Sequence, residues 1–439
     1  MESIELGVLG FLVLFVLMAI RIPIGLAMLM VGSVGSALII GPNAVLNGLK
    51  TLPYEHFSSY SLSIIPMFLL MGQCASQAGM STALFRAARA WLGHRRGGVA
   101  ISAIGACTAF GAISGSSLAT AGTMAQVALP EMKRAGYHGG IATGTLAAGG
   151  TLGILIPPSV VLVIYAILAE QNIAKLFAAA LLPGLLAAFT YMIAISLYAR
   201  RFPEAAPVVP KASRAERVTA LQSVWPVLVI FLLVIGGIYA GIFTPTEGAA
   251  VGTVSTFLLA LARRSMSRKG LVASIFGMTT GTGMIFLIVL GAALFNSFLA
   301  LTYLPQSGAA WVSGLGISPW LVLTAILVCY IVLGCVMDSL SMILLTIPIF
   351  FPIVVGLDFG LPPEETALWF GILVLIVVEM GMITPPVGLN LFIINSLARD
   401  IPMMQTIKGV LPFLGADLVR IVILVVFPVL TLALVRLLF

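Results

Sequence analysis

Charged residues are scarce in this chain of 439 residues. Only 8% of the residues are Asp, Glu, Lys or Arg, while 60% are hydrophobic. Soluble domains carry about 25% charged residues, so this composition excludes an ordinary soluble protein. Apolar segments long enough to cross a hydrocarbon core of roughly 30 Å recur along the whole sequence. The sequence therefore predicts an all-α, polytopic membrane protein.

Cysteine is also scarce, and several catalytic motifs are missing. The four cysteines lie inside apolar segments without the spacing of metal ligands, which argues against a disulfide framework or a zinc site. The sequence has neither an H-E-x-x-H motif nor a Walker A motif, and its three histidines lie near predicted loops. These absences argue against a metalloprotease, an ATPase or a serine hydrolase. We expect no enzymatic activity and no organic cofactor.

The net charge of +7 reflects basic clusters between the apolar segments. Such clusters are typical of the cytoplasmic loops of membrane proteins, and they give no support to nucleic-acid binding. If the chain crosses inward first, over residues 5–20, then 18 of the 22 Lys and Arg residues lie on the cytoplasmic side. The start MESIELGVLGFLVLF has no basic region before its apolar run, so we expect a retained first helix and not a signal peptide.

Ten spans and three amphipathic interfacial helices are predicted from hydropathy and charge. The predicted interfacial helices cover residues 43–60, 172–183 and 402–412. The predicted spans cover about 5–20, 24–41, 62–80, 141–169, 184–199, 222–240, 246–262, 271–300, 367–397 and 413–436.

The two halves of the chain share residues at similar offsets. Pro157-Pro158 and Pro385-Pro386 are separated by 228 positions, and Ser117 and Ser339 by 222. Offsets this similar, in the same order along the chain, predict a duplication. The charge pattern gives the halves opposite orientation, and inverted repeats are typical of secondary transporters. The predicted divisions are a first repeat over 1–200, a cytoplasmic linker over 201–220 and a second repeat over 221–439.

Each half contains a polar stretch that predicts a hairpin. Residues 97–130 carry no charged side chain, and 22 of these 34 residues are Gly, Ala, Ser or Thr. Arms shorter than the roughly 20 residues of a full span predict a re-entrant hairpin over 97–132 with its tip at GAISGSS. A tightly packed pair of full helices is the alternative. The corresponding hairpin covers 318–357, and its tip VMDSLS contains Asp338. A lone charged residue within the membrane is costly, so Asp338 is predicted to have a functional role.

The two Pro-Pro pairs predict broken helices over 141–169 and 367–397. Each pair removes backbone donors and clashes with the preceding turn. Carbonyl groups freed at such breaks are suitable ligands for sodium, and the N-termini of half-helices suit an anion. A simple kink is the alternative reading of a proline in a membrane helix.

Three long motifs together resemble one transporter family. They are GAISGSSLATAGTMAQVALPEMKRAGYHGGIATGTLAAGGTLGILIPPSVVLVIYA, GIYAGIFTPTEGAAVG and VEMGMITPPVGLNLF. The chain resembles the large membrane subunit of tripartite ATP-independent periplasmic (TRAP) transporters over nearly its whole length. The resemblance implies a sodium-coupled importer of a small carboxylate, such as a C4-dicarboxylate or sialic acid, with an elevator-type mechanism in a bacterial inner membrane. It also implies two partners, a periplasmic substrate-binding protein and a small four-helix membrane subunit, here expected on a separate chain.

The resemblance also implies site residues, many of which would act through their backbone carbonyls. The implied sodium-binding residues are Ser114, Gly115, Ser116, Ser117, Gly153, Pro157, Met337, Asp338, Ser339, Ile383, Thr384, Pro385 and Gly388. The implied substrate-binding residues are Ser116, Pro158, Ser341 and Asn390.

Several alternatives stay open from the sequence. Asn390 could equally form a hydrogen bond between two helices. Glu379 lies in an apolar run and could be a buried carboxylate with a structural role. Asp417 and Arg420, three positions apart, are expected to pair with each other. An ion channel would also explain polar re-entrant segments, although paired broken helices favour alternating access. The nearest competing function is a sodium/dicarboxylate symporter that needs no binding protein.

Overall fold

The computed structural model describes residues 3–314 and 316–439, and these residues form helices and no strands. Five helices are long and apolar enough to cross a membrane, or up to seven if each of two bent helix pairs is one span. The five are Ile173–Arg201, Arg214–Tyr239, Arg268–Leu301, Pro363–Met382 and Met403–Val426. The prediction of an all-α polytopic membrane protein is confirmed.

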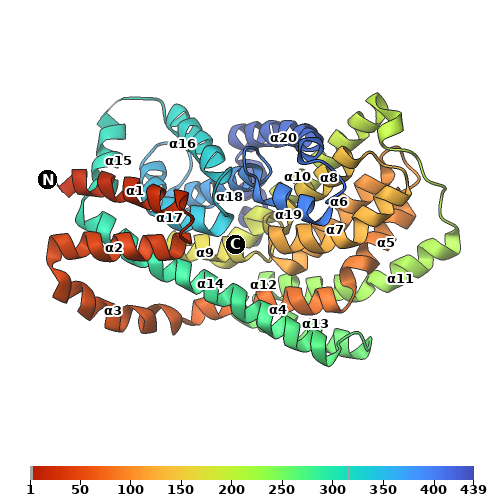
Figure 1. Ribbon diagram of the computed structural model, residues 1–439, viewed down its shortest axis with the longest axis horizontal. Coiled ribbons are helices and arrows are strands. Elements are labelled where there is room, and N and C mark those ends of the chain that lie inside the picture. The colour runs from red at the N-terminus through yellow and green to blue at the C-terminus, as the bar shows by residue number, and fades with distance from the viewer. Residues whose placement is uncertain (1–2, 315) are drawn as a thin grey trace.

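One group of helices lies along one side of the molecule, where α3, α4, α13 and α14 form the lower side in Figure 1. Helix α14 runs along α2 and α4, and α13 packs on α4. Gly25 and Gly291 permit the close approach of α2 and α14, because a Cβ atom at Gly291 would overlap the Gly25 carbonyl oxygen. The bounds in this part of the chain are α1 Ser3–Ala19, α2 Ile24–Ile40, α3 Pro42–Phe57, α4 Ile64–Gln77, α5 Met80–Leu92, α11 Arg214–Phe231, α12 Gly237–Tyr239, α13 Pro245–Ala262, α14 Arg268–Leu301 and α15 Leu304–Gly314, with short segments η1 Tyr60–Ser63 and η3 Leu232–Gly236.

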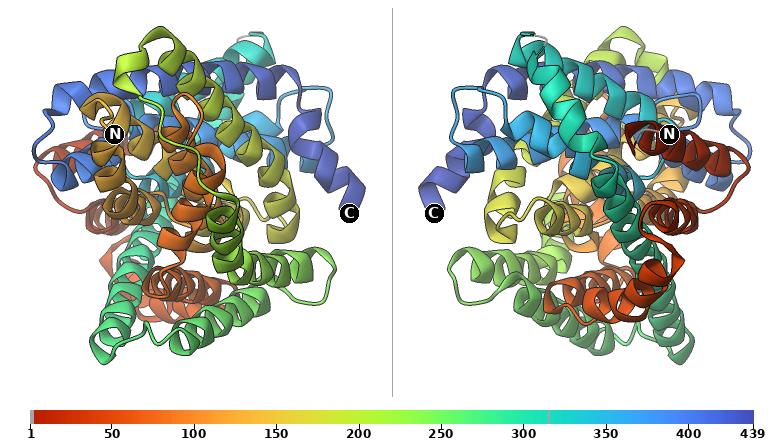
Figure 2. Two further views of the ribbon diagram at one scale, coloured as in Figure 1. Left: turned by 90° about the vertical axis from the view of Figure 1, so that its right-hand side faces the viewer. Right: turned by 90° about the vertical axis from the view of Figure 1, so that its left-hand side faces the viewer.

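The other helices form a second group, which makes up most of the upper part of both views in Figure 2. Helix α8 is at its centre and contacts α6, α7 and α20. All residues of α8 after Gly139 are buried, which explains its content of small residues. The bounds are α6 Gly98–Ser114, α7 Ser117–Arg134, α8 Gly139–Leu155, α9 Val160–Leu168, α10 Ile173–Arg201, η2 Pro203–Ala205, α16 Pro319–Gly334, α17 Ser339–Val355, α18 Pro363–Met382, α19 Leu389–Leu397, α20 Met403–Val426 and α21 Val429–Leu438.

The second group contains the same arrangement twice. A helical hairpin, α6–α7, precedes a helix broken at Pro157-Pro158, which separates α8 from α9. A second hairpin, α16–α17, precedes a helix broken at Pro385-Pro386, which separates α18 from α19. Helices α8 and α9 are bent by 46° at their break. The sequence thus located both hairpin tips and both breaks.

Two of the predicted interfacial helices are wrong as separate elements. Residues 172–183 belong to α10, one helix of 29 residues that continues through Pro183. Residues 402–412 belong to α20, which continues through Pro412 and ends at Val426, so the span predicted over 413–436 is interrupted. A proline inside a membrane helix is tolerated where neighbouring groups satisfy the freed backbone, so these prolines did not mark helix ends. Part of the predicted linker is also helical, because α11 begins at Arg214.

Candidate ion and substrate site

The tip of the first hairpin is a two-residue turn. Helix α6 ends at Ser114, Gly115 has a φ of +61°, and Ser116 caps the N-terminus of α7 by accepting a hydrogen bond from the Ala119 N–H. A glycine adopts this left-handed conformation without steric cost. The Ser114 hydroxyl lies 2.6 Å from the Thr120 hydroxyl, which ties the two arms together behind the tip.

This tip lies directly against the first broken helix. A Cβ atom at Gly115 would be 2.9 Å from the carbonyl oxygen of Pro158. A Cβ atom at Gly153 would be 2.6 Å from the carbonyl oxygen of Ser116. Pro157 and Pro158 are buried in the non-helical segment between α8 and α9. The structure therefore places the tip against the break, with Gly115 beside Pro158 and Ser116 beside Gly153.

The tip of the second hairpin is ordered by Asp338. Its carboxylate caps α17, accepting hydrogen bonds from the Ser341 N–H at 3.2 Å and from the Ser341 hydroxyl. Met337 and Ser339 on either side are buried, whereas Asp338 is half-buried. An aspartate at this position satisfies an N–H group that has no partner within the helix. The side chain thus has a structural role in addition to any contact with an ion.

The second tip lies against the second broken helix in the same way. The Gly388 N–H donates a hydrogen bond of 3.2 Å to the carbonyl oxygen of Cys335 at the tip. One turn before the break, a Cβ atom at Gly381 would be 2.6 Å from the Cα atom of Gly334. Small residues at equivalent places, Gly111 against Gly153, bring the first hairpin equally close to α8. Ile383, Thr384 and Pro385 form the break itself, between α18 and α19.

Asn390 joins the two broken helices. Its side chain is fully buried, and its Nδ2 donates to the Ala147 carbonyl oxygen of α8 at 3.3 Å. Its Oδ1 has no hydrogen-bond partner among the described residues. The helix-to-helix hydrogen bond left open by the sequence is present, and one polar atom of Asn390 remains available for a ligand. Among the other substrate-binding predictions, Ser341 is buried and its hydroxyl is bound to Asp338.

Sequence reasoning missed the contribution of two residues. Thr120 connects the two arms of the first hairpin, and its position one turn after Ser116 was the available signal. Glu379 is fully buried and accepts a hydrogen bond of 2.8 Å from the Ser339 hydroxyl at the second tip. The sequence left its role undecided because the three-dimensional neighbours of a lone carboxylate cannot be read from the chain.

Asp417 and Arg420 of α20 form a buried ion pair, as their spacing of three residues predicted. Arg420 Nη2 lies 2.8 Å from Asp417 Oδ1 on α20, and both side chains are fully buried. The Tyr191 hydroxyl of α10 donates to Asp417 Oδ2 at 3.0 Å and lies 3.3 Å from the Thr151 hydroxyl of α8. This network fixes α8, α10 and α20 relative to one another.

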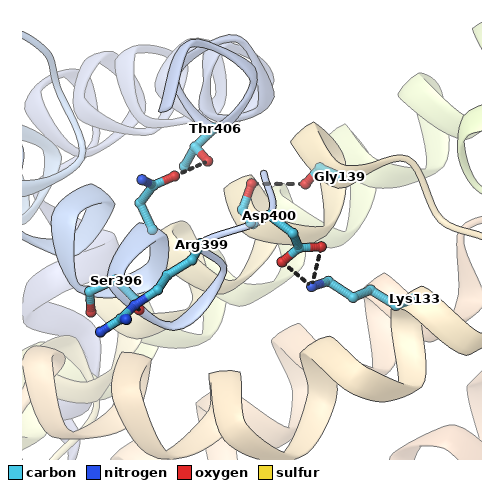
Figure 3. A network of polar contacts seen from close by, with 8 residues as sticks. Lys133, Gly139, Ser396, Arg399, Asp400 and Thr406 are labelled. Carbon is cyan, nitrogen blue, oxygen red and sulfur yellow. Dashed lines mark hydrogen bonds and ion pairs between the residues drawn. The ribbon is translucent and has the colours of Figure 1, made fainter. Parts of the chain in front are cut away.

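The two halves are also connected at the end where α7 finishes and α20 begins. Figure 3 shows Lys133 of α7 donating to both carboxylate oxygens of Asp400, at 2.6 and 2.8 Å. These hydrogen bonds from Lys133 hold the pKa of Asp400 below its ordinary value. Arg399, beside Asp400, turns back to the Ser396 carbonyl oxygen.

The arrangement provides two places where a hairpin tip faces an interrupted helix. Backbone carbonyls and serine hydroxyls are hard oxygen ligands of the kind that sodium accepts. Among the described residues there is no group of three or more His, Cys, Asp or Glu side chains that could hold a metal ion.

Comparison with known proteins identifies the family. Residues 11–430 match the family model of the DctM component of tripartite ATP-independent periplasmic transporters. The chain belongs to this family. It is 38% identical over 399 residues to the C4-dicarboxylate TRAP transporter large permease protein DctM of Pseudomonas aeruginosa, covering 90% of this chain and 91% of that protein. It is 32% identical over 377 residues to the sialic acid TRAP transporter large permease protein SiaM of Vibrio cholerae, covering 86% of each.

The permease is therefore an integral inner-membrane transport protein and not an enzyme. Large permeases of TRAP transporters work with a small membrane subunit and a periplasmic substrate-binding protein. The crystal structure of the YdaH transporter of Alcanivorax borkumensis has a similar fold, with a TM-score of 0.65 over 98% of each chain. At 15% sequence identity this likeness concerns the fold alone.

Proposed function

We propose that this permease imports a small organic carboxylate by sodium symport. The observation that carries the proposal is the pair of contacts between each hairpin tip and a Pro-Pro break. Each contact surrounds an interruption of helical hydrogen bonding with carbonyl oxygens and small or hydroxyl side chains. Interrupted helices of this kind coordinate sodium ions and substrate carboxylates in secondary transporters.

The two groups of helices suggest an elevator-type movement. In this proposal the hairpins and broken helices form a transport domain that moves as one body against α2, α4, α13 and α14. The buried Asp417–Arg420 pair and the packing of α8 on α6, α7 and α20 support rigid movement of the transport domain. If the two hairpins are inverted repeats, as the charge pattern predicts, they would provide the inward- and outward-facing states.

The names of the relatives support a substrate class and partners for this proposal. C4-dicarboxylates and sialic acid, named for the two relatives, both carry carboxylates, which suit the N-termini of α9 and α19. We propose that a periplasmic binding protein delivers the substrate and that the small membrane subunit is a separate chain.

Uptake is expected to require three proteins and a sodium gradient. Liposomes containing this permease and the small subunit, with a binding protein loaded with labelled succinate or sialic acid, should accumulate substrate under an inward sodium gradient. Omitting the binding protein should reduce uptake to the level of empty liposomes, because it presents the substrate to the membrane subunits. Scintillation counting of filtered liposomes measures both conditions.

Uptake of free succinate by the permease alone would instead establish the self-sufficient symporter. Equal uptake with sodium and with choline outside would contradict sodium coupling. A proton gradient without sodium serves as the control for the identity of the driving ion.

The Asp338→Asn variant is expected to need a higher sodium concentration while remaining folded. Asparagine retains an oxygen that caps α17, so the melting temperature without sodium should stay close to that of the wild type. Loss of the negative charge beside the proposed ion should raise the sodium concentration for half-maximal uptake by about tenfold, which corresponds to about 1.4 kcal/mol.

The Asp338→Ala variant separates the charge from the cap. It removes both functions, so its melting temperature should also fall, consistent with a loss of about 0.5–2 kcal/mol for a missing N-cap. If Asp338→Asn leaves the sodium midpoint unchanged and Asp338→Ala lowers only stability, Asp338 is a helix cap and not a part of the ion site.

A further inference from the structure

Glu379 occupies the place where the two hairpin tips approach each other. It lies on α18, one turn before the second Pro-Pro break, and it is fully buried. The Ser339 hydroxyl of the second hairpin donates to its Oε1 at 2.8 Å. The Ser117 hydroxyl of the first hairpin contacts the sulfur of Met382, three residues further along α18. This end of α18 thus meets serines from hairpins that are more than 200 positions apart in the sequence.

The two serines occupy equivalent positions. Ser117 is the first residue of α7, and Ser339 is the first residue of α17. Both hydroxyls also contact the sulfur of Met382, at 3.7 Å from Ser117 and 2.7 Å from Ser339. Glu379 and Met382 are three residues apart on α18. They therefore lie between the N-terminus of α7 and the N-terminus of α17.

Two helices begin beside Glu379, and the N-terminus of a helix carries a partial positive charge. They are α7 of 18 residues and α17 of 17 residues. Glu379, Asp417 and Arg420 are all fully buried. Of these three fully buried residues, two are acidic and one is basic, so the Asp417–Arg420 pair alone leaves Glu379 without a neutralising side chain.

The carboxylate also has unused bonding capacity. Its Oε2 has no hydrogen-bond partner that meets normal geometry among the described residues. A buried oxygen without a partner is costly, and a hydroxyl that comes closer to it is therefore favoured. The Ser117 hydroxyl contacts Met382, three residues further along the same helix, so a small rearrangement of the first tip would bring this hydroxyl to the free oxygen.

We propose that Glu379 is a positioning residue that couples the two hairpin tips through Ser117 and Ser339. This inference rests on the proposed function, because it assumes that each tip closes around a sodium ion. A sodium ion that orders one tip holds the serine of that tip against the Glu379 carboxylate. This contact reduces the conformational freedom of the Glu379 side chain. The second tip then meets an acceptor that is already ordered and loses less entropy on closing. Sodium binding at the two tips is consequently cooperative.

The test measures the melting temperature of the purified permease as sodium chloride replaces choline chloride. The wild type should be stabilised by sodium, with a dependence steeper than that of a single site. In Glu379→Gln the amide oxygen still accepts from one serine, but the NH2 group accepts from none. The melting temperature should then rise with sodium concentration as it would for two independent sites. The sodium concentration that gives half of the stabilisation should increase by about fivefold or more.

The control is Glu364→Gln. Glu364 lies on the same helix but is exposed at its start, where it pairs with Lys175. Loss of this carboxylate should leave both the steepness and the midpoint unchanged. Parallel sodium titrations of Glu379→Gln and the wild type would overturn the coupling role while leaving sodium binding intact. No sodium-induced stabilisation of the wild type would contradict the proposed function itself.

A double-mutant cycle tests the same link without depending on the folding of Glu379→Gln. Ser117→Ala and Ser339→Ala each break the connection, so the double variant should shift the sodium midpoint by much less than the two single shifts combined. If the serines act only as separate ligands at separate sites, their effects on the midpoint add, and the proposal is wrong.

Discussion

Replacing Arg420 with methionine is expected to lower the free energy of unfolding by about 3–5 kcal/mol. The guanidinium is fully buried, 2.8 Å from Asp417 Oδ1 and 5.5 Å from the centre of the Tyr191 ring. Its removal leaves Asp417 buried without a counter-charge, together with Glu379 nearby. A buried carboxylate that loses its partner retains its desolvation cost and loses the attraction that offset it.

The matched double variant distinguishes charge balance from packing. Asp417→Leu together with Arg420→Met removes both charges and keeps an apolar volume, so much of the lost stability should return. Lys175→Met is the exposed control, since it breaks a pair with Glu364 near the surface and should change the melting temperature little. Melting curves of the four proteins in the same detergent provide the comparison. An Arg420→Met variant as stable as the wild type would show that the pair contributes no net stabilisation.

Replacing Gly153 with alanine is expected to abolish most sodium-dependent uptake. The new Cβ atom would lie 2.6 Å from the Ser116 carbonyl oxygen, and it would also overlap the Thr120 hydroxyl. Both belong to the first hairpin, one to its tip and one to the first turn of α7. Overpacking of this kind costs about 1–3 kcal/mol, and moving the tip away from the break relieves it. At about 1.4 kcal/mol per factor of ten, sodium affinity should fall by about tenfold or more.

Gly105→Ala serves as the control in the same hairpin. A Cβ atom there would meet only the Met192 Cε atom, at an ordinary 3.6 Å. Alanine also favours the helix, by roughly 0.5–1 kcal/mol over glycine. Uptake by Gly105→Ala should match that of the wild type. If Gly153→Ala transports with an unchanged sodium midpoint, the contact between tip and break does not form part of the ion site.

Local signals in the sequence located the features that interrupt helices. Pro-Pro pairs cannot continue a helix, and the structure has its breaks at Pro157-Pro158 and Pro385-Pro386. The hairpin tips were equally predictable, the first from its uncharged glycine- and serine-rich run GAISGSS and the second from its lone charge, Asp338, at the equivalent place. The polar character of 172–183 and 402–412 was a less reliable signal, because neither segment is a separate helix. Pro183 and Pro412 lie inside continuous helices, since neighbouring helices and side chains compensate for one lost backbone hydrogen bond.

Composition, hydropathy and charge by themselves determined that this chain is an all-α membrane protein, and its motifs were sufficient to predict the family. The pairing of Asp417 with Arg420 was also readable, because residues three apart on a helix are neighbours. The cap that Asp338 forms on α17 is also a local contact, because Asp338 and Ser341 are three positions apart. Only the tertiary structure decided that Glu379 meets Ser339 and that Met382 contacts serines from both hairpins. Contacts of this second kind join segments far apart in the sequence, and they depend on how whole helices pack, which no local pattern encodes.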